Sequence, residues 1–283
     1  MHNNFKKKNN NNVDNEVVRD FGDEWSKYDQ SRSDLNLEDE YLKYFSIFPD
    51  QYLNFNAVGF DAGCGSGRWA KFLAPKVKKL FCFDPSQKAL DVAKRNLSDF
   101  DNCVFECATI NNCSIQNNSM DFGYCLGVLH HLPNTTSALN ACVSKLKKGA
   151  PFLIYIYYRF DNKPKWFKSI WKLVDLARKL ICFIPFRLKL IITKLIAIFV
   201  YFPLARISLL LELFGWDVSN IPLSHYRKKT FYFMSTDSLD RFGTKLEHRF
   251  TKAEIFSMMK NCGLSSIQFS DSSPFWIAIG YKN

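Results

Sequence analysis

Hydrophobic and polar positions alternate along much of the chain in the rhythm of strand–helix units. Between residues 57 and 158, short β-branched and aromatic runs are separated by segments with apolar residues at helical spacing. This alternation predicts an α/β fold with a mostly parallel sheet. The predicted strands are Ala57–Ala62, Lys79–Phe83, Cys103–Ala108, Asp121–Val128 and Pro151–Tyr158, and the predicted helices are Gly67–Ala74, Ser86–Leu97 and Thr135–Leu146.

A similar unit closes the chain. Thr251 is followed three residues later by Glu254, a spacing that predicts a capping box at the start of a helix. The helix is expected to reach Cys262, with Gly263 as its stop. Strands Ser266–Phe269 and Phe275–Tyr281 follow, so that the sheet gains two further strands.

Residues 159–245 break this rhythm and carry most of the net charge. Between Arg159 and Leu210 there are eleven Lys or Arg residues against Asp161 and Asp175, which gives +9 of the chain's +11. Aromatic residues are interleaved with these charges. Two interpretations follow: amphipathic helices on an anionic membrane surface, or a helical lid whose apolar face is buried. They are compatible, because a lid that touches a bilayer can admit a lipid-linked substrate.

Other features bear on the compartment. Residues 1–12 are rich in Asn and Lys without an apolar segment, so we expect a tail rather than a signal peptide. The longest apolar stretch, Leu195–Ala205, is bounded by Lys194 and Arg206 and contains Pro203, which argues against a spanning helix. Nine cysteines without a CxxC pair indicate reduced thiols, and their spacing disfavours a metal site. We expect a cytoplasmic protein, peripheral at most to the inner face of a membrane.

The most informative segment is Asp61-Ala-Gly63-Cys-Gly65-Ser-Gly67, where an apolar strand meets closely spaced glycines at a predicted helix start. Glycine lets a ligand lie against the backbone, and a helix N-terminus offers N–H groups to an anion. A dinucleotide fingerprint would need glycine at position 68, which is Arg68, so the dehydrogenase interpretation weakens. Asp84 ends the second strand, where a carboxylate can hold ribose hydroxyls. Alternatively, the glycines only form a tight turn and Asp84 caps the next helix.

Three blocks in this order resemble class I S-adenosylmethionine-dependent methyltransferases, closest to the group with quinone-biosynthesis C-methyltransferases. They are the glycine segment, Phe83-Asp84-Pro85-Ser86, and Ser119-Met-Asp121-Phe-Gly-Tyr-Cys-Leu-Gly127-Val-Leu-His130-His131-Leu-Pro133. The resemblance implies a Rossmann-like seven-stranded sheet with a helical insertion after the fifth strand. It also implies that S-adenosylmethionine is the cofactor. The implied cofactor residues are Asp61, Gly63, Cys64, Gly65, Gly67, Asp84, Pro85, Thr109, Ile110, Leu126 and Gly127.

Within that set, the resemblance implies that Asp61 orders the glycine loop and that Asp84 holds the ribose. Leu126 and Gly127 would lie beside the sulfonium. Many relatives have an acidic residue after the third strand, which accepts from the adenine amine. Here that position is Thr109, so its hydroxyl or the Ile110 backbone would take this role.

His130 and His131 follow the fourth strand, where parallel sheets open toward ligands. One of them is a candidate base for the acceptor's proton, or polarises a carbonyl. In the alternative, His131 only binds a loop carbonyl and fixes the turn that ends at Pro133. Trp25 and Tyr28, three residues apart, would share a helix face and either wall the pocket or pack a lid onto the sheet.

Arg241, His248 and Arg249 are candidates for holding an acidic or phosphate-bearing substrate. Ordinary salt bridges to Asp240 and Glu247 are the equal alternative.

The predicted organisation is a tail (1–15), a helical cover (16–50), a cofactor-binding core (51–158), a basic aromatic insertion (159–245) and the end of the core (246–283). The expected function is methyl transfer to a small-molecule or lipid-linked metabolite. A non-catalytic, membrane-associated scaffold that binds S-adenosylmethionine is the alternative. RNA methylation is disfavoured, because the segment after the fourth strand has neither the proline-aromatic tetrapeptide nor the Pro-Cys pair of base-modifying relatives.

Overall fold

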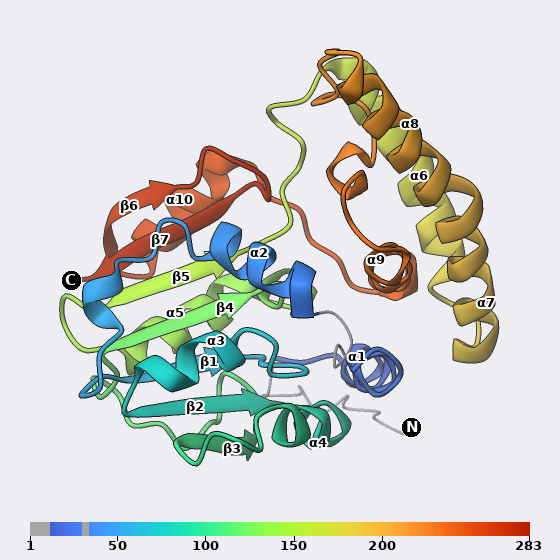
Figure 1. Ribbon diagram of the computed structural model, residues 1–283. Helices are drawn as coiled ribbons and strands as arrows, with labels where there is room; N and C mark the ends of the chain where they lie inside the picture. Colours follow the sequence, from blue (N-terminus) through green and yellow to red (C-terminus); the bar gives the residue numbers. More distant parts are fainter. Residues whose placement is uncertain (1–11, 30–33) are drawn as a thin grey trace, which may run out of the picture.

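The computed structural model describes residues 12–29 and 34–283. Its centre is a seven-stranded sheet in the order β3-β2-β1-β4-β5-β7-β6 (Figure 1). Strands β1 to β5 are parallel, and β7 runs antiparallel to both β5 and β6. The expected α/β sheet is confirmed. The strands are β1 Val58–Ala62, β2 Lys79–Asp84, β3 Cys103–Cys107, β4 Phe122–Leu126, β5 Pro151–Tyr155, β6 Leu264–Phe269 and β7 Ile277–Lys282.

The strand order reverses direction at β1, which pairs with β2 on one side and with β4 on the other. Because these strands are parallel, their carboxyl ends lie at one edge of the sheet. In open α/β sheets ligands bind outside the carboxyl ends at such a reversal. The loops after β1, β2 and β4 therefore meet where a ligand is expected.

Helices cover both faces of the sheet. On one face Phe60 and Phe152 belong to a buried cluster with α5 (Thr135–Lys145) and α10 (Lys252–Asn261). On the other, Phe122 and Tyr124 pack with α2 (Asp34–Tyr44), α3 (Ala70–Leu73) and α4 (Gln87–Asn96). Both hydrogen bonds of the predicted capping box at Thr251 and Glu254 are present at the start of α10.

Strands β4 and β5 end clearly earlier than predicted. β4 ends at Leu126 because Gly127 takes a left-handed conformation (φ +81°) and residues 129–131 then form a 3₁₀ turn. β5 ends at Tyr155, and the next backbone pairing is an isolated bridge from Tyr158 to Phe250. The residues just after both strands are thereby free to face the carboxyl edge of the sheet.

The insertion is helical. It consists of α6 (Lys165–Ile181), a continuous helix Phe186–Leu213 and α9 (Phe231–Gly243). The long helix is built from α7 (Phe186–Ile196), a π-helical turn (Ala197–Tyr201) and α8 (Phe202–Leu213). Here α6 and the Phe186–Leu213 helix are called the outer helices. In Figure 1, α9 lies between the outer helices and the sheet.

The argument against a spanning helix is wrong. By length and composition, the Phe186–Leu213 helix is long and apolar enough to cross a membrane, although a mostly buried core helix of a soluble protein can meet the same test. Pro203 does not break it, since it stands at the start of α8 just after the π-helical turn. Arg206 does not bound it either, because its guanidinium donates to the carbonyls of Arg227 and Lys229.

The N-terminal helix α1 (Asn15–Lys27) joins the core to the insertion. The predicted tail of residues 1–15 falls largely on residues 1–11, which lie outside the described residues. Asp20 binds Lys189 of α7 at 2.8 Å between Oδ2 and Nζ. On the opposite side a Cβ on Gly22 would stand 2.3 Å from Oγ of Ser86, which caps α4. Helix α1 is thus fixed between the two halves of the molecule.

Candidate functional site

The loop after β1 has the backbone that its glycines allow. Gly63, Gly65 and Gly67 all have positive φ (+74°, +54° and +74°), a region that other residues rarely adopt. A Cβ on Gly63 would also stand 2.6 Å from a methyl group of Val128. The glycine spacing therefore specifies a loop that turns tightly under the carboxyl ends of β1 and β4.

Asp84 holds this loop from the end of β2. Its Oδ2 accepts from the Gly65 N–H at 3.1 Å, and its Oδ1 accepts from the Ser86 N–H at 2.8 Å. Burial raises the pKa of Asp84 to about 6. The cap of α4 is Ser86, so Asp84 is not the helix cap of the alternative interpretation. Each carboxylate oxygen keeps a lone pair for a hydroxyl donor.

A cavity of about 190 Å³ lies at this edge. The predicted cofactor residues that line it are Gly63, Cys64, Gly65, Asp84, Pro85, Leu126 and Gly127. Around the position of a Cβ on Gly127 there is open space, with no described atom within 4 Å. The end of β4 therefore offers bare backbone to a ligand.

The other predicted cofactor residues do not line this cavity. Asp61 is buried beneath it, where burial raises its pKa to about 8, and its Oδ2 has no hydrogen-bond partner among the described residues. Gly67 turns the loop into α3. Thr109 donates its hydroxyl to Asn112 at 2.6 Å, and Ile110 is in the core. The geometry of the described residues thus gives no support to an adenine contact from Thr109 or Ile110.

Helix α1 covers one side of the cavity. The Trp25 indole lies 3.0 Å from the position of a Cβ on Gly65 and lines the cavity. Arg68 also lines it, with its guanidinium 5.2 Å from the Trp25 ring. The expectation for Tyr28 is wrong: α1 ends at Lys27, and Tyr28 packs on Tyr232 outside the cavity.

The two histidines have different surroundings. His130 is fully buried, does not line the cavity and stacks on Tyr157, and burial holds its pKa well below the ordinary value. His131 lines the cavity, and its Nδ1 lies 2.8 Å from the Leu246 carbonyl. Since a carbonyl only accepts, Nδ1 carries the hydrogen and Nε2 keeps its lone pair. The structure therefore places only His131 where an acceptor could reach it.

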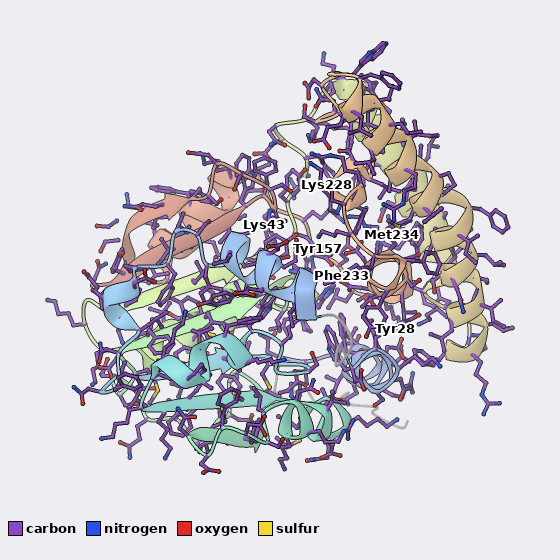
Figure 2. All side chains as sticks on the ribbon, in the orientation of Figure 1. Tyr28, Lys43, Tyr157, Lys228, Phe233 and Met234 are labelled. Carbon is purple, nitrogen blue, oxygen red and sulfur yellow. The ribbon has the colours of Figure 1, made fainter. Side chains whose placement is uncertain are left out.

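Four carboxylates that the sequence analysis did not select also line the cavity: the buried Glu24 and Glu40, and the half-buried Asp237 and Asp240. Oδ1 of Asp240 lies 3.8 Å from Nε2 of His131, and its Oδ2 accepts from the Tyr157 hydroxyl at 2.5 Å. Burial raises the pKa of both Asp240 and Glu24. Oδ1 of Asp240 and Oδ2 of Asp237 have no hydrogen-bond partner within the described chain. Figure 2 shows Tyr157 and Phe233 between the sheet edge and α9.

A second cavity, of about 1310 Å³, lies between the core and the insertion. It shares Tyr155, Tyr157 and Asp237 with the first, so the two are adjacent. Arg241 and Arg249 line it, whereas His248 lines neither. Arg249 is paired with Glu247 at 2.6 Å, as the salt-bridge alternative anticipated. The guanidinium of Arg241 has no acceptor among the described residues.

Arg241 differs in this respect from the other basic residues of the large cavity. Their partners are protein groups: Glu40 for Lys43 and Lys229, the Ser219 carbonyl for Lys163, Glu212 for Arg227 and Lys228, and Glu247 for Arg249. Asp237, one turn earlier on α9, partly balances the charge of Arg241. Within the described chain no group of three or more His, Cys, Asp or Glu side chains is arranged to hold a metal ion.

Residues 60–154 match a family described as a methyltransferase domain. Residues 60–154 therefore form a methyltransferase domain, on the fold of class I S-adenosylmethionine-dependent enzymes. Its fold is similar to a protein described as a methyltransferase from Bacillus halodurans C-125, with a TM-score of 0.51, 15% identity, and coverage of 82% of this chain and 72% of that one. It is also similar to the methyltransferase bound to the Trm112 activator of Haloferax volcanii, with a TM-score of 0.53, 14% identity and coverage of 93% and 96%. At these identities the likeness concerns the fold.

A curated relative is the tRNA U34 carboxymethyltransferase of Aliarcobacter butzleri (strain RM4018), 29% identical over 136 residues. The match covers 46% of this chain, and the chain spans less than half (44%) of that relative. The cofactor of the methyltransferase domain is S-adenosylmethionine. The site fits it, since Asp84 offers lone pairs for ribose hydroxyls and Gly127 leaves open space at the end of β4.

Proposed function

We propose that the chain transfers a methyl group from S-adenosylmethionine to a hydroxyl or amine of a lipid-linked or small amphiphilic metabolite that bears an anionic group. The observation that carries the proposal is the large cavity beside the cofactor site, which contains one guanidinium, that of Arg241, without a hydrogen-bond acceptor among the described residues. Its wall combines aromatic and aliphatic side chains from both outer helices. Such a lining suits an apolar body, and Arg241 suits a carboxylate or phosphate.

The bound cofactor supplies an electrophilic methyl group on a sulfonium. Asp84 would hold the ribose, and the Leu126–Gly127 backbone would face the reacting end. Trp25 and the rest of α1 would exclude water from the cofactor cavity. Alignment alone supplies on the order of 7 to 11 kcal/mol in such reactions.

His131 and Asp240 would receive the acceptor's proton. The hydrogen bond from Nδ1 to Leu246 leaves Nε2 of His131 as the basic atom. Once a proton is on Nε2, the Asp240 carboxylate 3.8 Å away stabilises the imidazolium. The hydroxyl of Tyr157 fixes the orientation of that carboxylate.

Kinetics of single variants test this assignment. Asp240→Asn keeps an acceptor for Tyr157 but removes the charge, and His131→Gln removes the base. Each is expected to lower kcat/KM on the order of 100-fold or more, while the affinity for S-adenosylhomocysteine stays within twofold. Wild-type turnover of both variants from pH 6 to 9 would contradict the role.

The anionic group is tested at Arg241. Arg241→Gln is expected to raise KM for the acceptor at least tenfold, because a charge-assisted hydrogen bond contributes about 1.5–3 kcal/mol. Its effect on cofactor affinity should be small. As a control, Lys228→Gln changes a cavity residue that Glu212 already neutralises. Equal KM values for both variants and wild type would remove Arg241 from acceptor binding.

The acceptor itself is identified with labelled cofactor. Three pools are incubated with the protein: extracted lipids, water-soluble metabolites and total tRNA. Labelled products are then identified by mass spectrometry. A labelled lipid or small anionic metabolite supports the proposal, and S-adenosylmethionine binding without turnover in any pool supports the scaffold alternative.

RNA methylation is the second candidate, because of the similarity to a tRNA-modifying enzyme. Against it, twelve of the eighteen exposed large hydrophobic side chains between Trp166 and Trp216 are aliphatic, whereas RNA surfaces rely on aromatic stacking platforms among basic residues. Label found in tRNA alone would replace the lipid-linked assignment.

A further inference from the structure

The exposed large hydrophobic side chains are concentrated in one part of the chain. Among the described residues, all of them except Leu42, Phe55 and Phe256 fall between Trp166 and Trp216. Leu173 is 71% exposed and Phe199 is 72% exposed. An apolar surface of this extent on a folded domain marks an interaction site. At 1.5 Å per residue, the longer outer helix extends it over about 40 Å.

The charged groups on this surface are of one sign. Lys165, Lys172, Arg187 and Lys194 are exposed, and their charged side-chain groups make no hydrogen bond or ion pair with another described residue. The two carboxylates of the outer helices are only partly exposed and are neutralised: Asp175 by Arg178 and Lys179, Glu212 by Arg227 and Lys228. The exposed surface of the outer helices therefore presents aliphatic, aromatic and basic side chains, without a fully exposed carboxylate among the described residues.

The inner face of the long helix is attached to the rest of the molecule. Lys189, Thr193 and Ser208 are buried on it. The Lys189 ammonium binds Asp20 of α1 and the Gly243 carbonyl of α9, and the Thr193 carbonyl accepts from Ser238. A transmembrane orientation would strip Lys189 and Thr193 from these partners. The long helix is therefore built to lie along a surface rather than across a bilayer.

We propose that the outer helices bind the surface of an anionic lipid bilayer, with their aliphatic side chains inserted at the acyl boundary and their Lys and Arg side chains among the headgroups. A second copy of the chain suits this surface less well, because two copies would bring the same unpaired basic residues together. The inference is independent of the proposed acceptor. Ile170 and Val200 of the outer helices line the large cavity and are each 44% exposed. The proposed membrane surface therefore adjoins the large cavity.

Flotation of the full chain with vesicles tests the proposal, without cofactor or acceptor. Vesicles contain phosphatidylcholine alone or with 30% phosphatidylglycerol at about 0.1 M salt. We expect most of the protein to float with the anionic vesicles and at least tenfold weaker partitioning onto the neutral ones. Because no turnover is measured, failure here leaves the methyltransferase assignment intact, and absence of turnover leaves the flotation result intact.

Two sets of variants separate the apolar from the electrostatic contribution. Leu173→Glu with Leu195→Glu places charge on exposed positions of both outer helices and is expected to abolish flotation. Phe55→Glu, a change at a 78% exposed residue outside the surface, is the matched control and should float like wild type. Replacing Lys165, Lys172 and Lys194 by Ala is expected to weaken binding about fivefold per charge, on the order of 100-fold together.

Three results would overturn the proposal. They are absence of flotation at either composition, flotation of the double Glu variant equal to wild type, and a dimer in light scattering that the double Glu variant dissociates while vesicles leave it intact. The last result would assign the surface to a second copy of the chain.

Discussion

The carboxyl edge of the sheet and the outer helices differ in which side chains they expose. At the sheet edge, polar groups are buried and held by backbone within a few residues or on the adjacent strand, as Asp84 is by Gly65 and Ser86. On the outer helices, large apolar groups are exposed and polar groups such as Lys189 are turned inward. The first arrangement holds a defined small molecule in a fixed geometry. The second presents an extended surface to a broad partner.

The largest expected effect concerns the sheet edge. Asp84→Ala removes two charge-assisted hydrogen-bond acceptors and should weaken S-adenosylhomocysteine binding on the order of 1000-fold in calorimetry. Asp91→Ala is the control, since this exposed carboxylate on α4 binds only the Gln87 side chain. Unchanged affinity in a folded Asp84→Ala variant would remove the carboxylate from the site.

The next prediction concerns the junction between the two regions. Lys189→Met leaves the partly buried Asp20 without its partner and should lower the free energy of unfolding in urea by about 3 kcal/mol. Adding Asp20→Leu should restore most of that loss. Lys194→Met, an exposed change on the same helix, should remain within about 0.5 kcal/mol of wild type. Equal stability of the Lys189 and Lys194 variants would mean that the ion pair does not join the two halves.

A smaller effect is expected from pH. Burial raises the pKa of Asp84 to about 6, and the ionised form is the one that accepts two hydroxyls. S-adenosylhomocysteine affinity should therefore be constant above pH 7 and fall by up to tenfold per pH unit below pH 6. In Asp84→Asn this dependence should disappear. A decline that persists in Asp84→Asn would have to come from another group.

The smallest effect is local to the core. Thr251→Ala removes one half of the capping box of α10 and should cost about 1 kcal/mol of stability, with cofactor affinity unchanged. Thr251→Ser should retain most of the stability. A loss of cofactor affinity in the alanine variant would show that α10 influences the site across the sheet.

Features with local causes could be predicted from the sequence. The glycine loop, the acidic end of β2 and the capping box each follow from residues within a few positions of one another. Side chains whose partners are distant in the chain could not be placed: Lys189 binds Asp20, and Asp240 approaches His131. Their charges are visible in the sequence, but burial is not. The apolar stretch Leu195–Ala205 looks short in the sequence for the same reason, since the contacts that turn Arg206 inward come from residues 227 and 229.

The ion pairs of α1 have a consequence for engineering by recombination. Asp20 of this helix binds Lys189 and Glu16 binds Lys245, and both lysines belong to the insertion. Trp25 of the same helix covers Gly65. A chimera that received a foreign insertion alone would leave both acidic residues facing the wrong neighbours and shift the indole from its place. The transplantable module is therefore discontinuous: an N-terminal helix and a distant insertion that have to be exchanged together.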